Sequence, residues 1–209
     1  MFEDREIPLQ IDIPTRREWL DGREVTIASV ADAPGEEVSP AGANPYGFAS
    51  TTSLAAGALY LGSAVSEGDL LSLGLSRGFC NLSSEAALSG GVSQEDLLRL
   101  LAHSDSPGQA QRGHSLEDLA QTIESGSKVI AFVNAGELWD QADGPGLSEA
   151  NRAVVIEGVA RDAQSQQICG FLVRDPATPG RSAFADSART TRMWLDTGGW
   201  QIVPSHLEV

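Results

Sequence analysis

Two thiols and three imidazoles are the side chains of this sequence that could support nucleophilic catalysis or bind a metal ion. Nucleophilic catalysis by a cysteine needs a thiolate beside an imidazole that takes up its proton. Cys80 and His114 are the pair to consider for this chemistry, although nothing in the sequence places them within hydrogen-bond distance. The alternative interpretation is a loop cysteine near a helix and a histidine beside a helix N-cap. Cys169 lies in an apolar run, which predicts a buried, unreactive thiol.

The ligand-type side chains form no metal-binding pattern. His103, His114 and His206 share no ligand spacing, and no Cys-x-x-Cys pair is present. The acids around the Gly-Pro loop at 144–145 lack the dense alternation of oxygen ligands that a calcium loop needs, and they predict a solvated loop. We therefore expect neither a metal ion nor another cofactor.

Charge and composition exclude several classes of function. The chain of 209 residues has a formal charge of −15, so it repels phosphate backbones, and we expect no nucleic-acid partner. Its hydrophobic content of 41% supports a folded core, and no apolar run approaches the length of a membrane span. The N-terminal stretch MFEDREIPLQ has no apolar core of a signal peptide, which predicts a cytoplasmic protein with reduced thiols.

The elements that must position these residues change in type along the chain. Residues 7–13 and 24–30 alternate as strands do, and a Pro- and Gly-rich loop over 31–47 leads into an apolar helix, in which Thr51 and Ser53 are cap or early-helix residues. Three further helices are predicted, each after a capping serine: Ser66 before 67–75, Ser93 before 94–102, and Ser115 before 116–124.

The second half of the chain is rich in strands. These are predicted over 128–134, 153–159, 167–174 and 200–203, with one last helix over 184–195. Helices followed by strands indicate an α+β fold of two lobes, with a site in the cleft between them.

A series of short motifs follows one order along the chain. It consists of ASTTSLA from Ala49, VSE (65–67), SRGFCN (76–81), GHSLEDL (113–119), VNAGELW (133–139), NRAVV (151–155) and GFLVRDP (170–176). In order and spacing, these motifs resemble the bacterial papain-like peptidases of family thirty-nine of the cysteine peptidases. This group is related to double-glycine leader peptidases, and the similarity is to its stand-alone soluble branch. The resemblance extends from Asn44 to Val203.

The resemblance implies a papain-like α+β fold with an N-terminal helical lobe and a C-terminal antiparallel β lobe. We expect N-terminal strands and a loop over 1–43 and a peptidase-like domain over 44–209. Within that domain, the helical part would span 44–126 and the β part 127–209.

The resemblance also assigns the catalytic positions, and most of them hold the wrong residue. Ala49 stands at the nucleophile position and Arg152 at the position of the histidine base, while Asp175 matches the orienting carboxylate. Asn44 is the only amide where the family has an oxyanion-stabilising glutamine. An alanine cannot attack a carbonyl, and an arginine cannot act as a base near neutral pH. Arg152 and Asp175 could instead form an ion pair that closes the site or binds a carboxylate. Trp139 is a candidate for the lining of the cleft.

These substitutions predict a catalytically inactive cysteine-peptidase-like protein that binds a peptide or a protein, for which an active paralogue is one candidate. Two alternatives stay open. One is a structural subunit of a larger assembly, and the other is a residual cysteine peptidase that uses a displaced thiol such as Cys80.

Overall fold

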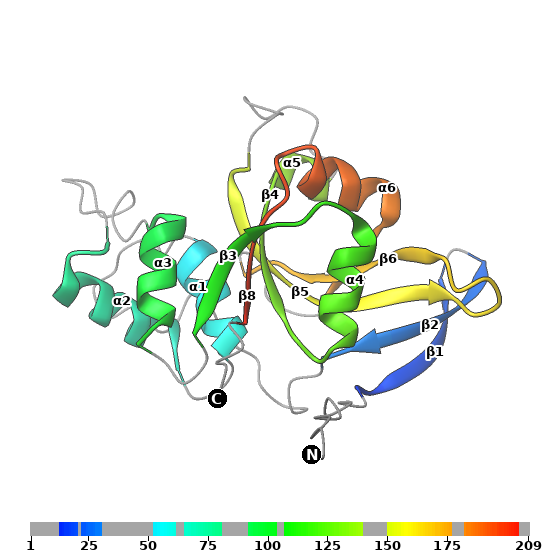
Figure 1. Cartoon of the computed structure of the whole chain (residues 1–209), viewed down its shortest axis with the longest axis horizontal. Coiled ribbons are helices and arrows are strands. Elements are labelled where there is room, and N and C mark those ends of the chain that lie inside the picture. Colours follow the sequence, from blue (N-terminus) through cyan, green and yellow to red (C-terminus); the bar gives the residue numbers. More distant parts are fainter. Residues whose placement is uncertain are drawn as a thin grey trace, which may run out of the picture.

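The computed structural model describes residues 13–20, 22–30, 52–61, 65–80, 92–103, 107–139, 150–176 and 182–204. Eight strands from these residues form one antiparallel sheet (Figure 1). They are β1 (Thr15–Leu20), β2 (Arg23–Ser29), β3 (Gly108–Arg112), β4 (Val129–Val133), β5 (Arg152–Asp162), β6 (Ile168–Arg174), β7 (Ala183–Asp186) and β8 (Trp200–Pro204).

The long strand β5 organises this sheet. The first half of β5, residues 152–156, pairs with β4, and the second half, residues 158–162, pairs with β2. The strand β6 pairs with residues 155–161 of β5. Because a strand has two edges, β4 and β2 share one edge of β5, and β6 takes the other. Beyond these neighbours, β8 and β3 follow β4, β1 follows β2, and β7 follows β6.

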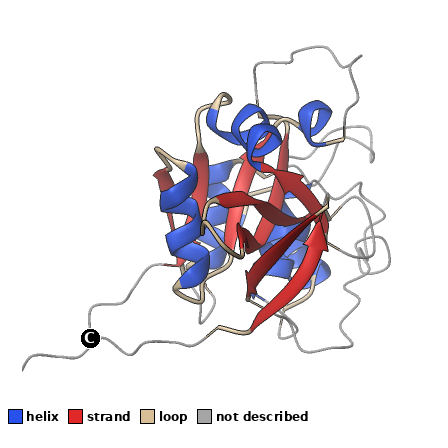
Figure 2. Cartoon of the chain, turned by 90° about the vertical axis from the view of Figure 1, so that its right-hand side faces the viewer, coloured by secondary structure: helices blue, strands red, loops and turns tan. Residues whose placement is uncertain are grey.

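Helices pack on both faces of the sheet, as Figure 2 shows. They are α1 (Thr52–Leu61), α2 (Glu67–Arg77), α3 (Gln94–Leu101), α4 (Leu116–Glu124), α5 (Ala135–Leu138) and α6 (Ser187–Thr190), with a π-helical turn η2 (Thr191–Leu195) after α6. No helix of the described residues is long and apolar enough to cross a membrane.

The side chains of β4 alternate between two hydrophobic clusters, one on each face of the sheet. Val129, Ala131 and Val133 belong to the buried cluster that includes residues of α4, α5 and η2. Ile130 belongs to the opposite cluster, with residues of α1 and α3. Successive side chains of a strand point to opposite faces, so a strand covered on both faces must be apolar at every position, as the sequence VIAFV is.

The three serine caps are confirmed. Each of Ser66, Ser93 and Ser115 accepts a hydrogen bond from the backbone N–H three residues later. Ser66 also completes a capping box, because its own N–H donates to the Asp69 carboxylate at 2.9 Å. These caps set the starts of α2, α3 and α4.

The predicted strands over 24–30, 128–134, 153–159, 167–174 and 200–203 are confirmed as β2, β4, β5, β6 and β8. The predicted helix over 184–195 is wrong in its first part, because residues 183–186 pair with β6 as β7. Asp186 then ends the strand and caps α6 by accepting from the Arg189 N–H at 2.7 Å. The predicted strand over 7–13, the loop over 31–47 and the early cap Thr51 fall almost wholly outside the described residues, and so does the side chain of Ser53.

The observed fold is thus a mixture of helices and an antiparallel sheet. Besides β7, two strands of the sheet have no counterpart among the predicted ones. β1 pairs with β2, and β3, which comes from the part expected to be helical, pairs with β8. The boundary between 1–43 and 44–209 stays a prediction, and β1 and β2, from the first of these segments, belong to the same sheet as the strands of the second.

Candidate functional site

Asp175 is the centre of the candidate site. It follows the last residue of β6, and its side chain is only 1% exposed. One of its oxygens, Oδ2, accepts from Arg152 Nη1 at 2.7 Å and from Trp139 Nε1 at 2.7 Å. The three residues, called the Asp175 cluster below, come from the end of β6, the start of β5 and the end of α5.

Two asparagine side chains hold the short helix α5 in place. The Asn134 amide oxygen accepts from the N–H groups of Gly136 and Glu137, and the Asn151 amide oxygen accepts from the N–H of Ala135 at 2.9 Å. The first turn of α5 therefore has its N–H groups satisfied by side chains on both flanks. Since Trp139 ends this helix, the two amides fix where its indole lies.

The turn formed by α6 and η2 holds α5 from the other side. Arg189 Nη1 donates to the Leu138 carbonyl at 3.3 Å, and Arg192 Nε donates to the Glu137 carboxylate at 2.8 Å. Figure 1 shows α5 and α6 together at the same end of the sheet. The indole that binds Asp175 is therefore supported by both neighbouring segments.

The chemistry open to this cluster follows from its charges. A buried carboxylate needs a cation or several donors, and Arg152 supplies the charge. The guanidinium has no lone pair to accept a proton, so it cannot activate a nucleophile. Its side chain is 28% exposed, and it has donors beyond the one that Asp175 uses. The cluster can therefore bind a carboxylate or a carbonyl oxygen through Arg152, but Arg152 cannot act as a general base.

The ion pair between Arg152 and Asp175, which the sequence suggests as a possibility, is present in the structure. The structure also brings Trp139 into hydrogen-bond contact with Asp175, which spacing alone did not predict. Asn44 and Ala49 lie outside the described residues, so their place at the site stays a prediction. Sequence reasoning missed the positioning roles of Asn134 and Asn151, although an asparagine directly before Ala-Gly-Glu is a recognisable helix-capping signal.

A second acid–arginine pair lies on the same two strands. The register of β5 and β6 passes from Ile156 opposite Val173 to Gly158 opposite Leu172, which leaves Glu157 as the extra residue of a β-bulge. The Glu157 carboxylate is buried and accepts from Arg174 Nη2 at 3.1 Å and from the Ser182 hydroxyl. No sequence signal marked this pair, because a bulge depends on the register of the neighbouring strand.

Cys80 lies in the apolar cluster between α1, α2 and α3. Burial, with a smaller contribution from the charge of Asp96, raises the pKa of the Cys80 thiol. A Cβ atom added at Gly74 would lie 2.3 Å from its sulfur, which shows how tightly the thiol is enclosed. His114 lies exposed ahead of α4, and no hydrogen bond joins the two residues within the described part of the chain. The environment of Cys80 is that of a structural thiol.

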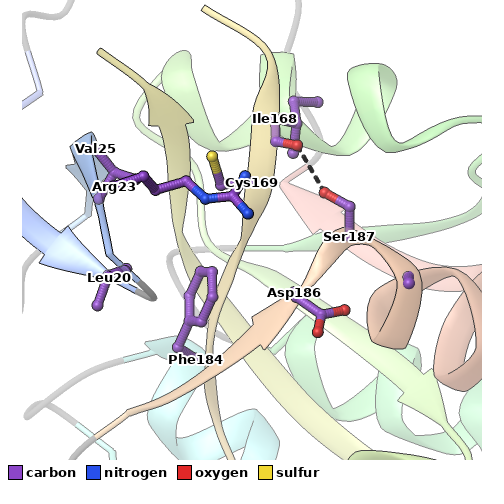
Figure 3. A pocket seen from close by; sticks show the side chains of 9 residues that line it. Leu20, Arg23, Val25, Ile168, Cys169, Phe184, Asp186 and Ser187 are labelled. Carbon is purple, nitrogen blue, oxygen red and sulfur yellow. Dashed lines mark hydrogen bonds between the residues drawn. The ribbon is translucent and has the colours of Figure 1, made fainter.

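The prediction of a buried Cys169 is wrong. Its side chain is partly exposed, because it lies near the start of β6 and lines a surface hollow there (Figure 3). His103 is exposed and its Nδ1 lies 2.7 Å from the Arg99 carbonyl, while His206 lies outside the described residues. Among the residues described, no three side chains of metal-ligand type gather into a cluster.

Comparison with known proteins supports the fold. No model of a known protein family matches the chain, and no curated protein matches it. A crystal structure from Bacillus anthracis, described as a "putative C39-like peptidase", superposes with a TM-score of 0.50 at 16% identity. The match covers 82% of this chain and 98% of that one. The chain therefore has the fold of a C39-like peptidase, the family of cysteine peptidases that its motifs resemble.

Proposed function

We propose that this chain is a catalytically inactive relative of the papain-like peptidases of family thirty-nine, and that it binds an extended peptide or protein segment. The segment would lie in a cleft between a helical lobe and a β lobe, beside the Asp175 cluster. The protein would act in the cytoplasm, and an active paralogue is one candidate for its partner.

The arginine at the position of the base carries this proposal. A catalytic histidine must exchange a proton with the nucleophile, and the carboxylate behind it orients the ring. Here the carboxylate of Asp175 is engaged at 2.7 Å by a guanidinium that keeps its proton. Ala49 at the nucleophile position supports the same conclusion, since the catalytic groups of a peptidase act as a unit.

The same pair suits a binding role. The exposed part of the Arg152 guanidinium can donate to a peptide carbonyl or to an acidic side chain. The Trp139 indole has its N–H directed at Asp175, so its ring is held in one orientation and offers a rigid apolar surface. Because Asp175 neutralises Arg152, the site would favour extended main chain over highly acidic ligands.

Selection from a library of random peptides, followed by affinity measurement on the purified protein, tests this proposal. The informative variant replaces both charges, Arg152→Met with Asp175→Asn, because it removes the guanidinium without leaving a buried charge unpaired. We expect the double variant to bind a selected peptide at least tenfold more weakly, about 1.4 kcal/mol. Ala49→Trp, which fills the nucleophile position, should abolish binding.

Arg17→Met is the matched control, because Arg17 is an exposed arginine on β1, paired with Glu24 at 3.5 Å and remote from the Asp175 cluster. It should leave peptide affinity unchanged. Equal affinity in the wild type, the Ala49→Trp variant and the double variant would exclude this cleft as the binding site. Cleavage of the selected peptides by the wild-type chain would refute catalytic inactivity.

A further inference from the structure

A hollow of about 300 Å³ opens at the end of the sheet remote from the Asp175 cluster. It lies between β1, β2, β6, β7 and the start of α6 (Figure 3). Cys169 and Asp175 stand near opposite ends of β6, which separates the hollow from the candidate site by about 20 Å at the usual rise of a strand. A volume of this size is at the lower end of what small-molecule sites occupy.

The floor of the hollow is apolar. Leu20 and Phe184 are both partly exposed and supply its apolar surface, and they pack against the fully buried Val25 beneath. Figure 3 shows the Phe184 ring among the side chains that line the hollow. Such a floor favours a ligand with an aliphatic or aromatic part.

Arg23 supplies a positive charge on the β2 side. Within the described part of the chain, its guanidinium makes no hydrogen bond or ion pair. The acid whose pKa it influences is Asp162, and that pKa is lowered mainly by the N–H groups of Ser165 and Gln164, with only a minor contribution from Arg23. The donors of Arg23 are thus available to an anion at the rim of the hollow.

Asp186 supplies a negative charge on the opposite side. Its Oδ1 accepts from the Arg189 N–H at the start of α6, and no cationic side chain pairs with its carboxylate among the described residues. Figure 3 shows Arg23 and Asp186 as separate members of the lining, with no hydrogen bond between them. Two opposite charges without an ion-pair partner among the described residues flank this apolar surface, which matches the charge pattern of an amino acid.

We propose that this hollow binds a small zwitterionic ligand of the size of an apolar amino acid. Its carboxylate would pair with Arg23, its ammonium group with Asp186, and its side chain would cover Leu20 and Phe184. Cys169 stands in the wall, so a bound ligand would shield its thiol. The site is independent of the function proposed for the Asp175 cluster.

Protection of Cys169 from alkylation by iodoacetamide provides the test, measured by mass spectrometry on the full chain with L-leucine as the probe. We expect millimolar L-leucine to slow alkylation of Cys169 several-fold, and calorimetry to give a matching dissociation constant. N-acetylleucine keeps only the carboxylate and leucine amide keeps only the ammonium group, so each should bind at least tenfold more weakly. Leucyl-leucine tests whether the site takes a free amino acid or the end of a peptide. Its two charges lie further apart than those of L-leucine, so it should bind more weakly if the site fits a free amino acid.

Two variants assign the charges. Arg23→Gln should abolish the difference between L-leucine and leucine amide, and Asp186→Asn should abolish the difference between L-leucine and N-acetylleucine. Asparagine is as good a helix cap as aspartate, so the second variant keeps α6 intact. Arg17→Gln is the matched control on β1 and should bind L-leucine as the wild type does. Unchanged alkylation of Cys169 together with no binding heat from L-leucine would overturn the proposal.

Discussion

At the scale of single residues, the buried Asp175 carboxylate depends on Arg152 for its charge balance. An ion pair with one fully covered partner is strongly destabilising when only the other partner is removed, because the remaining charge cannot reach water. The Trp139 indole adds a second donor but no charge. Removal of Arg152 alone should therefore cost more stability than removal of both charges together.

We expect Arg152→Ala to lower the free energy of unfolding by about 3 kcal/mol, as the loss of one partner of a buried pair does. The double variant Arg152→Met with Asp175→Asn should recover most of that loss, since it leaves no charge buried. Urea unfolding followed by circular dichroism measures both. Equal losses in the single and double variants would show that packing of the arginine, and not its charge, stabilises this region.

Glu67 is the second residue whose charge state matters. It starts α2, is 1% exposed, and neither carboxylate oxygen has a hydrogen-bond partner among the described residues. Burial raises its pKa to about 7 from an ordinary value of 4.5. The native state therefore holds a proton that the unfolded chain releases between these two pH values.

The raised pKa of Glu67 makes the protein less stable at high pH than at low pH. The stability that protonated Glu67 contributes is fully present below about pH 4.5 and is lost as the pH rises through about 7. At pH 8, Glu67→Gln should therefore be more stable than the wild type, by up to about 3 kcal/mol. Thermal unfolding between pH 4 and pH 8 tests this, because the stability difference between the two proteins should grow from about pH 4.5 and level off above about pH 7. Parallel curves would mean that water reaches the carboxylate.

At the scale of elements, α4 is bound to the sheet by a charged contact as well as by its apolar face. Arg161 on β5 donates to Glu124 at 2.6 Å and to Glu117 at 2.7 Å, both on α4. These hydrogen bonds are the main cause of a raised pKa of Arg161. The Arg161 side chain is only 16% exposed, so its contacts are less screened than those of a surface pair.

We expect Arg161→Met to destabilise the fold by about 1–2 kcal/mol, since both acids keep partial access to water. Added salt should reduce the difference between variant and wild type, because it screens the exposed part of the contact. Arg17→Met on β1, an exposed arginine that pairs with Glu24 at 3.5 Å, is the matched control and should change stability by less than about 0.5 kcal/mol. A salt-independent loss at Arg161 would assign its role to packing.

Elements set by local interactions could be predicted, and those set by distant partners could not. The helices after Ser66, Ser93 and Ser115 follow from caps within three residues. β3, with the sequence GQAQR, has no apolar alternation and exists as a strand through its pairing with β8. The sequence of β7 predicts the start of a helix, because the hydrogen bonds that make it a strand come from β6.

The same distinction applies to the candidate site. The roles of Arg152 and Asp175 were suggested by motifs that resemble a known family, whereas the part played by the Trp139 N–H depends on how α5 is oriented. That orientation is set by Asn134, Asn151 and the α6 turn, which are far apart in the sequence. No local pattern encodes such an arrangement.

At the scale of the whole molecule, one sheet joins segments from both halves of the chain. β1 and β2, from the N-terminal part, pair with the second half of β5, while β4 pairs with its first half. The similarity to the Bacillus anthracis structure extends over most of this arrangement, at an identity of only 16%. Two sequences this different thus share a fold, and a shared fold does not by itself determine function.

The position of β8 has a consequence for how this protein is made. β8 lies between β4 and β3, and it is the only described strand that pairs with β3. Until residues 200–204 have left the ribosome, β3 lacks its partner and the outer edge of β4 is open. The helices can form before β8 has emerged, but β3 and β4 can be joined only once it has, through contacts between distant residues that form slowly. During that interval the nascent chain presents an apolar strand edge, which is when chaperones would be needed most.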